Sequence, residues 1–405
     1  MIETSRSPGA GRRVLILVEN LPVPFDRRVW QEATTLSAAG YQVSVICPKG
    51  RGHEAAEEMI DGIRILRHGL PLEARGLTGY LLEYGAALFH QTRLALRVWR
   101  SGGVDVVQAC NPPDLLFLVA LPFKLFGGAR FIFDHHDLVP ELFETKFGRR
   151  GMLRRLVVAA ERMTFSLADV SIATNETFRD IAVARGGMDP DRVRIVRSYP
   201  DLSRFERREP QTGLKAEGET LVGYVGVIGE QDGAELLVGA MAELVLARGR
   251  RDLRCVIIGD GPALAGCRAM AERLGLDDHV RFAGYLSGER LLAHLSAVDI
   301  GVIPDPSNPF NDKLSMNKVF EYMALGLPFV QYDLAQARRE AGEAALIVEG
   351  DGPVALADGI VALADDRERR ARMSAYGLRH ARKTFTWESQ TSALLDAYDC
   401  ACRAR

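Results

Sequence analysis

The sequence predicts an α/β protein of two doubly wound domains, which are parallel sheets covered by helices, facing each other across a cleft. Three observations predict this fold class. Short aliphatic segments alternate with longer amphipathic ones along the whole chain, as in sheets whose parallel strands are joined by helices. The short segments are apolar on both faces, which indicates that helices cover both sides of each sheet. The length of 405 residues suits two domains of ordinary size.

Each half of the chain contributes one series of buried strands. The first series is expected at 14–18, 42–47, 63–66, 105–109, 130–134, 170–174 and 192–196. The second is expected at 220–226, 254–260, 279–285, 298–304, 328–333 and 345–349. Helices lie between most strands, and the one that starts near Arg27 ends at Gly40, a residue common just after a helix. The charged segment 203–220 has neither periodicity and is interpreted as a linker between domains at 1–202 and 221–384.

Composition excludes several classes of protein. A net charge of -2 argues against nucleic acid as the main partner, although residues 1–200 hold 26 Lys and Arg against 22 Asp and Glu. The six cysteines are scattered without metal-type pairs, so we expect reduced thiols in a cytoplasmic protein. The N-terminal residues lack the apolar core of a signal peptide. The longest apolar run, 115–123, is too short for a membrane helix.

The usual nucleotide-binding motifs do not fit. A dinucleotide dehydrogenase needs GxGxxG directly after a strand, but the residues after 14–18 contain no glycine before the first helix. Gly259 and Gly261 do follow a strand, yet the third glycine is missing. A tight turn from strand to helix explains that pair as well as a cofactor contact does. A P-loop sequence is also absent.

A different anion site is predicted at 315–330. Ser315 is expected to cap a helix whose first turn holds Asn317 and Lys318, so that free N–H groups and a cation lie together. Glu321 follows one turn later on the same face, where a carboxylate can bind a ribose diol. The alternative is a surface helix with an ordinary Lys318–Glu321 pair.

The run DIGVIPDPSNPFNDKLSMNKVFEYMALGLPFVQYD resembles the donor-binding segment of family 4 nucleotide-sugar glycosyltransferases of the bacterial polysaccharide-biosynthesis type. The stretches DRRVWQEATTLSAAGYQVSVI, FDHHDLVPE, VIIGDGP and FAGYL extend the likeness, which runs in order to FTWESQTSALLDAY near the end. The resemblance implies the two-domain GT-B fold and retention of anomeric configuration. It also implies a nucleoside-diphosphate sugar as donor, with no metal or cofactor required. A C-terminal helix at 385–405 is expected to cross back to the first domain.

The resemblance also implies roles for single residues. Glu321 would bind the ribose, and the remaining donor-binding residues of the second domain would be Gly226, Gly284, Tyr285, Asn317 and Lys318. Two departures from the family pattern matter. Lys313 stands where the family often has a first Glu, and the loop 226–233 lacks the usual Arg and Lys. We therefore expect Lys318 and the helix start to hold the diphosphate, helped by Arg28 or Arg197 from the first domain.

The stretch FDHHDLVPE at 133–141 allows three interpretations, namely a metal site, a polar strand end or a substrate-orienting site. The strand period of two separates Asp134 and His136 from His135, so adjacent imidazoles cannot easily chelate one ion. By resemblance His136 contacts the donor sugar, and Asp137 lines the same cleft together with Glu141. We therefore predict His136, Asp137 and Glu321 as the catalytic residues, without a metal ion.

A basic helical segment at 146–162 predicts a surface for the acceptor. It holds six cations against one acid, and Leu153, Leu156, Val157, Ala160 and Met163 form an apolar stripe along it. Such helices bind anionic lipid, although a core stripe beneath a solvated charged face explains the same pattern. If the segment binds anionic lipid, neutralising Arg149, Arg150, Arg154 and Arg155 should abolish that binding. Arg93, Arg97 and Arg100 beside Trp99 add to the same basic half.

The function predicted from the sequence is sugar transfer to a glycan or a polyprenyl-diphosphate-linked acceptor, in the cytoplasm at the inner face of the cell membrane. Two alternatives stay open. A nucleotide-sugar epimerase shares the fold but needs its own set of acids and bases. A degenerate binding protein would hold a nucleotide sugar without turnover, which the missing Glu and cations permit.

Overall fold

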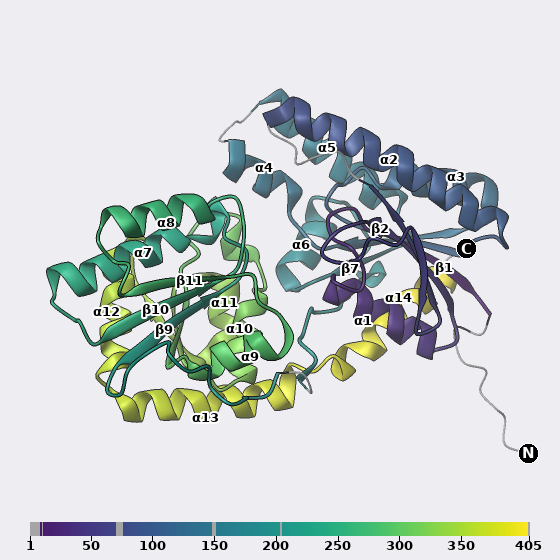
Figure 1. Ribbon diagram of the computed structural model, residues 1–405. Helices are drawn as coiled ribbons and strands as arrows, with labels where there is room; N and C mark the ends of the chain where they lie inside the picture. The colour runs from purple at the N-terminus through teal and green to yellow at the C-terminus, as the bar shows by residue number, and fades with distance from the viewer. Residues whose placement is uncertain (1–8, 10, 70–75, 148–150, 203–204, 404–405) are drawn as a thin grey trace, which may run out of the picture. The chain divides into compact units, whose positions relative to one another are not determined.

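The computed structural model describes residues 9, 11–69, 76–147, 151–202 and 205–403. Contacts divide the chain into two compact units (Figure 1). Unit 1 comprises Met1–Ser198 with Gln390–Arg405, and unit 2 comprises Tyr199–Ser389. Each unit is built around its own sheet.

Unit 1 contains an eight-stranded sheet in the order β3-β4-β2-β1-β5-β6-β7-β8. Neighbouring strands are parallel except β3 and β4. The strands are β1 (Arg13–Leu17), β2 (Gln42–Pro48), β3 (Glu57–Ile60), β4 (Ile63–His68), β5 (Val106–Cys110), β6 (Arg130–His135), β7 (Val170–Ala173) and β8 (Val193–Ile195). The helices are α1 (Arg27–Ala38), α2 (Gly76–Arg100), α3 (Phe117–Gly127), α4 (Val139–Phe147), α5 (Met152–Leu167), α6 (Glu176–Ala184) and α14 (Glu388–Arg403).

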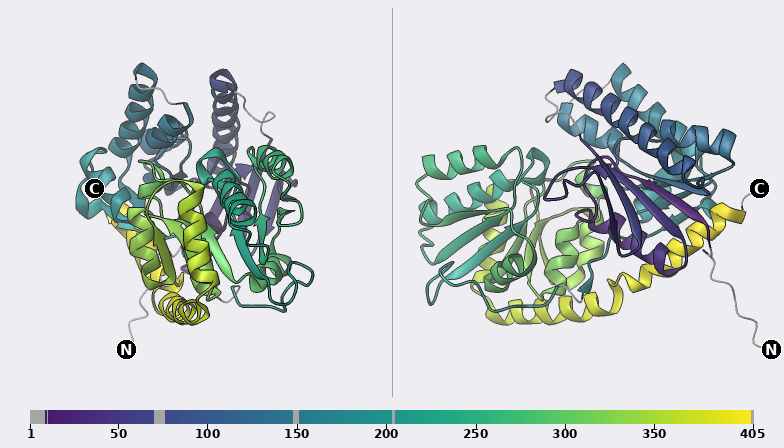
Figure 2. Two further views of the ribbon diagram at one scale, coloured as in Figure 1. Left: turned by 90° about the vertical axis from the view of Figure 1, so that its left-hand side faces the viewer. Right: turned by 45° about the vertical axis from the view of Figure 1, so that its right-hand side comes forward.

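Helices cover both faces of this sheet. Helices α2, α3 and α5 lie side by side on one face, and α1 and α14 lie on the other (Figures 1 and 2). Helix α1 begins where the side chain of Asp26 accepts the backbone N–H of Val29 at 3.1 Å. It ends just before Gly40, whose φ of 92° suits the residue after a helix. Arg28 and Glu32 lie on the buried side of α1.

Unit 2 contains a six-stranded parallel sheet in the order β11-β10-β9-β12-β13-β14. The strands are β9 (Thr220–Val225), β10 (Leu253–Ile258), β11 (Val280–Gly284), β12 (Ile300–Ile303), β13 (Phe329–Tyr332) and β14 (Ala345–Val348). The helices are α7 (Ala234–Ala242), α8 (Leu264–Arg273), α9 (Gly288–Ala297), α10 (Asn317–Ala324), α11 (Ala335–Ala341), α12 (Pro353–Ala364) and α13 (Arg367–Thr384). One apolar core packs α7, α8 and α12 on one face, and a second packs α9, α10 and α11 on the other.

The strand order locates the places where ligands bind in such sheets. The order reverses beside β1 and β5 in unit 1, and beside β9 and β12 in unit 2. Doubly wound sheets bind ligands outside the carboxyl ends of the strands at these switch points. The residues that follow β5, β6, β9 and β12 are therefore the ones to consider.

The predicted α/β class with two doubly wound sheets is confirmed. Every strand expected from the apolar segments is present, and β3 was missed because the segment EEMI is an exposed, antiparallel edge strand. Of the segment 203–220 predicted as a linker, residues 205–219 belong to unit 2. Arg207 from this segment donates to the backbone oxygen of Leu325 at 2.8 Å. Among the described helices, none combines the length and the apolar character that crossing a membrane requires.

Candidate functional site

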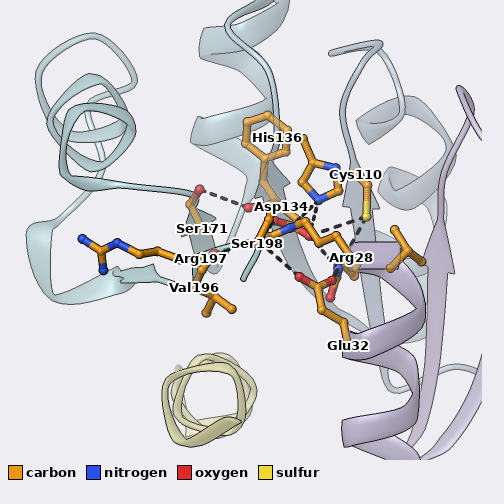
Figure 3. Close-up of polar contacts among 12 residues, drawn as sticks. Arg28, Glu32, Cys110, Asp134, His136, Ser171, Val196, Arg197 and Ser198 are labelled. Atoms are coloured by element: carbon orange, nitrogen blue, oxygen red, sulfur yellow. Dashed lines mark hydrogen bonds and ion pairs between the residues drawn. The ribbon is translucent and has the colours of Figure 1, made fainter. Parts of the chain in front are cut away.

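Unit 1 gathers polar side chains at the carboxyl ends of β5 and β6. His136 follows β6 directly, and its Nε2 lies 2.7 Å from Oδ2 of Asp134. The backbone N–H of His136 donates to Oδ1 of Asn111 at 2.6 Å, and that of Asp137 donates to the same oxygen at 3.1 Å. Asp134 and His136 share the face of the sheet that carries α1, as the strand period predicts (Figure 3).

Arg28 reaches into this group from α1. Its side chain is only 7% exposed and donates to Asp134 Oδ1 at 2.8 Å, to the backbone oxygen of Val196 at 2.8 Å and to Ser198 Oγ at 3.0 Å. Its Nε lies 2.8 Å from Nε2 of His136. The guanidinium expected to assist a donor diphosphate is thus bound by side chains of its own unit (Figure 3). In this arrangement Arg28 organises Asp134 and His136.

The group holds two carboxylates for one fixed cation. Burial alone would raise the pKa of Asp134, but the charge of Arg28 outweighs it and holds that pKa well below its usual range. Burial and the charge of Asp134 raise the pKa of Glu32 to about 8. The pKa of His136 would fall through burial, yet Asp134 raises it above its ordinary value. Near neutral pH a proton on Glu32 therefore offsets the surplus negative charge of the two carboxylates.

Metal-ligand atoms also gather here. Single ligand atoms of Glu32, Cys110, Asp134 and His136 lie within 4.8 Å of one another. However, Nη2 of Arg28 already lies 2.8 Å from Asp134 and 3.2 Å from Glu32. Burial raises the pKa of the Cys110 thiol well above its usual value, whereas a metal ligand must be a thiolate. The donor set thus fits the arginine already bound there better than a metal ion.

The other predicted residues of unit 1 lie apart from this group. His135 is fully buried against Phe165 and Phe178 on the opposite face of the sheet, and burial lowers its pKa to about 3. Glu141, expected beside Asp137, accepts two bonds from Arg185 at 2.7 and 3.1 Å.

Arg197 also points away from the His136 group. Its side chain turns from Arg28 and Asp134 and pairs with Glu176 (Figure 3). Its backbone N–H donates to Oε1 of Gln390 at 3.0 Å, so this residue fastens the start of α14 within unit 1.

Unit 2 holds a buried cation at its own switch point. Nζ of Lys318, in the first turn of α10, lies 2.6 Å from Oδ2 of Asp305, which follows β12. The same ammonium lies 5.0 Å from the ring centre of Tyr224 on β9. Burial alone would lower the pKa of Lys318, but Asp305 and then Asp232 raise it above its ordinary value. Lys318 is thus held as a charged group at the carboxyl ends of β9 and β12.

Glycines let the loops after β9 and β10 approach each other beside this cation. A Cβ on Gly259 would lie 1.9 Å from the backbone oxygen of Gly226, and one on Gly261 would lie 2.5 Å from that of Ile228. A Cβ on Gly226 would itself lie 2.9 Å from the Tyr224 hydroxyl. The glycine pair after β10 is therefore required by backbone packing against the loop that contains Gly226. This supports the tight-turn interpretation of that pair.

The start of α10 differs in detail from the prediction. The cap position is Met316, and no side chain there accepts a first-turn N–H. Ser315 was expected to cap the helix, but its hydroxyl donates to Oε1 of Glu340 at 2.5 Å. Asn317 is exposed, and Glu321 is buried one turn along. The helix start is therefore open to an external acceptor, while Lys318 pairs with Asp305.

Gly284 and Tyr285 lie farther along the sheet. Gly284 ends β11, the edge strand, and its backbone oxygen accepts the N–H of Gly259 at 2.9 Å. Tyr285 follows it and is 49% exposed. Gly284 thus supports the loop after β10, and the Tyr285 ring is accessible at the edge of the sheet.

The two halves of the chain match models of glycosyltransferases. Residues 26–204 match the model described as Glycosyltransferase Family 4, and residues 219–366 match the model described as Glycosyl transferases group 1. The chain belongs to the family 4 glycosyltransferases. These matches cover the His136 group of unit 1 and the Lys318 group of unit 2.

Curated relatives of this glycosyltransferase chain align with about three fifths of it. The D-inositol 3-phosphate glycosyltransferase of Corynebacterium efficiens is 31% identical over 260 residues, covering 60% of this chain and 59% of the relative. The 2-deoxystreptamine glucosyltransferase of Streptomyces kanamyceticus is 29% identical over 278 residues, covering 67% and 70%. The chain thus spans less than two thirds of the length of the inositol-phosphate relative.

Solved structures share the GT-B fold over nearly the full length. The sucrose-phosphate synthase of Thermosynechococcus elongatus superposes with a TM-score of 0.77 at 18% identity, covering 96% of this chain and 98% of that one. The Anabaena protein HepE in complex with UDP-glucose gives a TM-score of 0.68 at 15% identity, covering 95% and 99%. At these identities the likeness establishes the fold.

Sequence reasoning missed several side chains that complete the two groups. Glu32 stands four residues after Arg28 on a helix, and Gln108 interrupts an apolar strand, so both gave a signal in the sequence. Asp305 follows the strand at 298–304 and could have been paired with Lys318 on topology alone. Tyr398 gave no such signal, because only the fold brings α14 beside β5.

Proposed function

We propose that this family 4 glycosyltransferase moves a sugar from a nucleoside-diphosphate sugar to a glycan or lipid-linked saccharide, with retention of configuration. The observation that carries the proposal is the buried, charged Lys318 at the open start of α10. A helix start and an ammonium group together favour an anion with several oxygens. Their place at the switch point of the unit 2 sheet is where such folds bind nucleotides.

The proposed chemistry needs charge stabilisation more than a strong nucleophile. Negative charge builds on the leaving diphosphate, and Lys318 with the first N–H groups of α10 would stabilise it. Glu321 would bind the ribose, and Gly226 would leave room for the phosphates. In unit 1, His136 would orient the sugar, held by Asp134 at 2.7 Å, with Asp137 beside it. This scheme uses no metal and no cofactor.

The acceptor is proposed from the surface of unit 1. Helix α5 exposes Met152, Leu156 and Met163 next to Arg155 and Arg162. Apolar side chains flanked by cations suit a membrane that contains anionic lipid, such as the inner face of the cell membrane. A polyprenyl-diphosphate-linked saccharide would be reached there, in polysaccharide or glycolipid synthesis.

Small cyclitols are the second acceptor class. The names of two relatives mention D-inositol 3-phosphate and 2-deoxystreptamine. Transfer should therefore be assayed with both compounds as acceptors, as well as with lipid-linked saccharides.

The test is thermal stabilisation of the purified protein by UDP, GDP, ADP, CMP and dTDP, with and without Mg²⁺. A ligand well above its Kd raises Tm by mass action. We expect one nucleoside diphosphate to raise Tm regardless of Mg²⁺, and its sugar conjugate to support transfer with retention, read by NMR of the product. Stabilisation without any transfer or donor hydrolysis would favour the degenerate binding protein. A well-folded sample that none of the nucleotides stabilises would contradict the proposal.

A further inference from the structure

A buried chain of hydrogen bonds links the C-terminal helix to the His136 group, all within unit 1. The hydroxyl of Tyr398, on α14, donates to Oε1 of Gln108 at 2.5 Å. Nε2 of Gln108 donates to Oε2 of Glu32 at 2.6 Å and to Oδ2 of Asp134 at 3.1 Å. That same Oδ2 lies 2.7 Å from Nε2 of His136. Tyr398 and Gln108 are both fully buried.

This chain fixes the orientation of the Gln108 amide. The ionised carboxylate of Asp134 needs a donor, and only the NH₂ end of the amide can supply it. The Tyr398 hydroxyl supplies the donor that the oxygen end needs. If the amide turned over, its oxygen would face Oδ2 of the ionised Asp134 without a proton between them. A buried network with every member satisfied holds its geometry, whereas an unpaired end loosens it.

Gln108 acts on the oxygen that His136 uses. Because Oδ2 of Asp134 accepts from Gln108 and also contacts His136, the amide helps to fix the position of that oxygen. The second carboxylate oxygen is held by Arg28 at 2.8 Å. Asp134 is therefore fixed at both oxygens, and the imidazole ring takes its orientation from it.

We propose that Tyr398 is a positioning residue, which acts through Gln108 and Asp134 to hold the His136 ring in the orientation that sugar transfer requires. The proposal rests on the proposed function, since the transfer reaction is what His136 serves. On this proposal, α14 supports the His136 group in addition to covering the sheet. The last helix of the chain supplies the donor that completes a polar site assembled from α1, β5 and β6.

A double-mutant cycle on the full-length protein tests this. The variants are Tyr398→Phe, Gln108→Met and the two together, assayed for transfer with the donor found by thermal stabilisation. Losing one buried hydrogen bond should lower kcat about tenfold in each single variant. The double variant should be no worse than the worse single one, because both changes break the same chain. The Kd of the nucleoside diphosphate should change less than about twofold, since unit 2 binds it.

Tyr41→Phe is the matched control. The Tyr41 ring packs edge-on against Tyr398 with centroids 5.5 Å apart. The charges that act on the pKa of the Tyr41 hydroxyl include Asp399 and Arg12 but not Asp134. We expect this variant to keep its kcat and to combine additively with Gln108→Met. Additive losses of kcat for Tyr398→Phe and Gln108→Met would overturn the positioning role. So would a loss of kcat that disappears when the variant is assayed well below its Tm, because the loss would then come from unfolding. Absence of turnover in the unmodified protein, with a donor that it binds, would instead overturn the proposed function.

Discussion

The acidic neighbours that keep Lys318 protonated also offset part of its positive charge. Asp305 holds the ammonium at 2.6 Å and keeps it protonated despite burial. Without a ligand this pair is neutral overall, so a diphosphate meets a cation that is already partly compensated. Under the proposed function, the first N–H groups of α10 would therefore have to contribute to binding. Under the proposed function, this shared arrangement would compensate for the absence of Arg and Lys from the loop 226–233.

Replacing Lys318 should weaken nucleotide binding strongly. Hydrogen bonds to charged groups contribute about 1.5–3 kcal/mol, so Lys318→Met should raise the Kd of the stabilising nucleotide about 10- to 100-fold. Isothermal calorimetry measures this directly. Lys318→Met with Asp305→Asn removes the carboxylate that would otherwise stay buried alone, which separates binding from folding.

Lys215→Met is the control for that change. Lys215 pairs with Asp299 at the opposite, amino-terminal end of β12 in the same unit. Its replacement should leave the Kd unchanged. Equal weakening by Lys215→Met and Lys318→Met would contradict the placement of the diphosphate at α10.

Asp232 should make nucleotide binding depend on pH. Burial raises the pKa of Asp232 to about 6, while the charge of Lys318 opposes the rise. A bound diphosphate adds negative charge and should raise that pKa further, so binding takes up a proton. Affinity should therefore rise as pH falls from 8 through about 6. In Asp232→Asn this component should be missing, while the titration of the nucleotide phosphate stays common to both proteins. Identical slopes of log Kd against pH for the two proteins would contradict this linkage.

Local patterns predicted the elements of the fold better than the partners of single side chains. The strand period placed Asp134 with His136 and apart from His135, since that alternation is a property of the backbone. The prediction that Ser315 caps α10 was wrong, because α11 places Glu340 where it accepts the Ser315 hydroxyl. A contact between segments far apart in sequence overrides a local preference of comparable energy.

Segments at the edges of the units were the hardest to predict. Strand β3 is exposed and acidic, so it lacks the apolar pattern that revealed the buried strands. The segment 205–219 has no period, yet Arg207 caps the end of α10 by donating to Leu325 and Gly326. Lys215 adds an ion pair to the start of β12. These polar contacts, together with the isolated apolar residues Leu214 and Phe205, fasten the segment to unit 2. Such scattered residues form no periodic apolar pattern that the sequence could reveal.

The two halves of the chain differ in charge and in surface. Residues 1–200 are the basic half, and their helices α2, α3 and α5 lie side by side on one face of the unit 1 sheet (Figure 1). This face exposes large apolar side chains, among them Phe89 at 66% and Leu156 at 60%. Arg154 is paired with Glu144, whereas Arg155 and Arg162 are exposed. Arg149 and Arg150 lie outside the described residues.

Binding to lipid vesicles tests whether this surface meets a membrane. We expect the protein to bind vesicles with 30% anionic lipid through Phe89, Leu156 and the arginines of α5. Salt should weaken this binding, because part of the attraction is electrostatic. Arg155→Gln with Arg162→Gln should lower the partition coefficient about thirtyfold, at about 1 kcal/mol for each charge near the surface. Leu156→Ser should lower it further without changing its salt dependence. The controls are Arg338→Gln with Arg372→Gln and Leu246→Ser, which change equally exposed side chains of unit 2. If these controls reduce binding as much as the α5 variants, the attraction is general to the protein and the face formed by α2 and α5 is not its membrane surface.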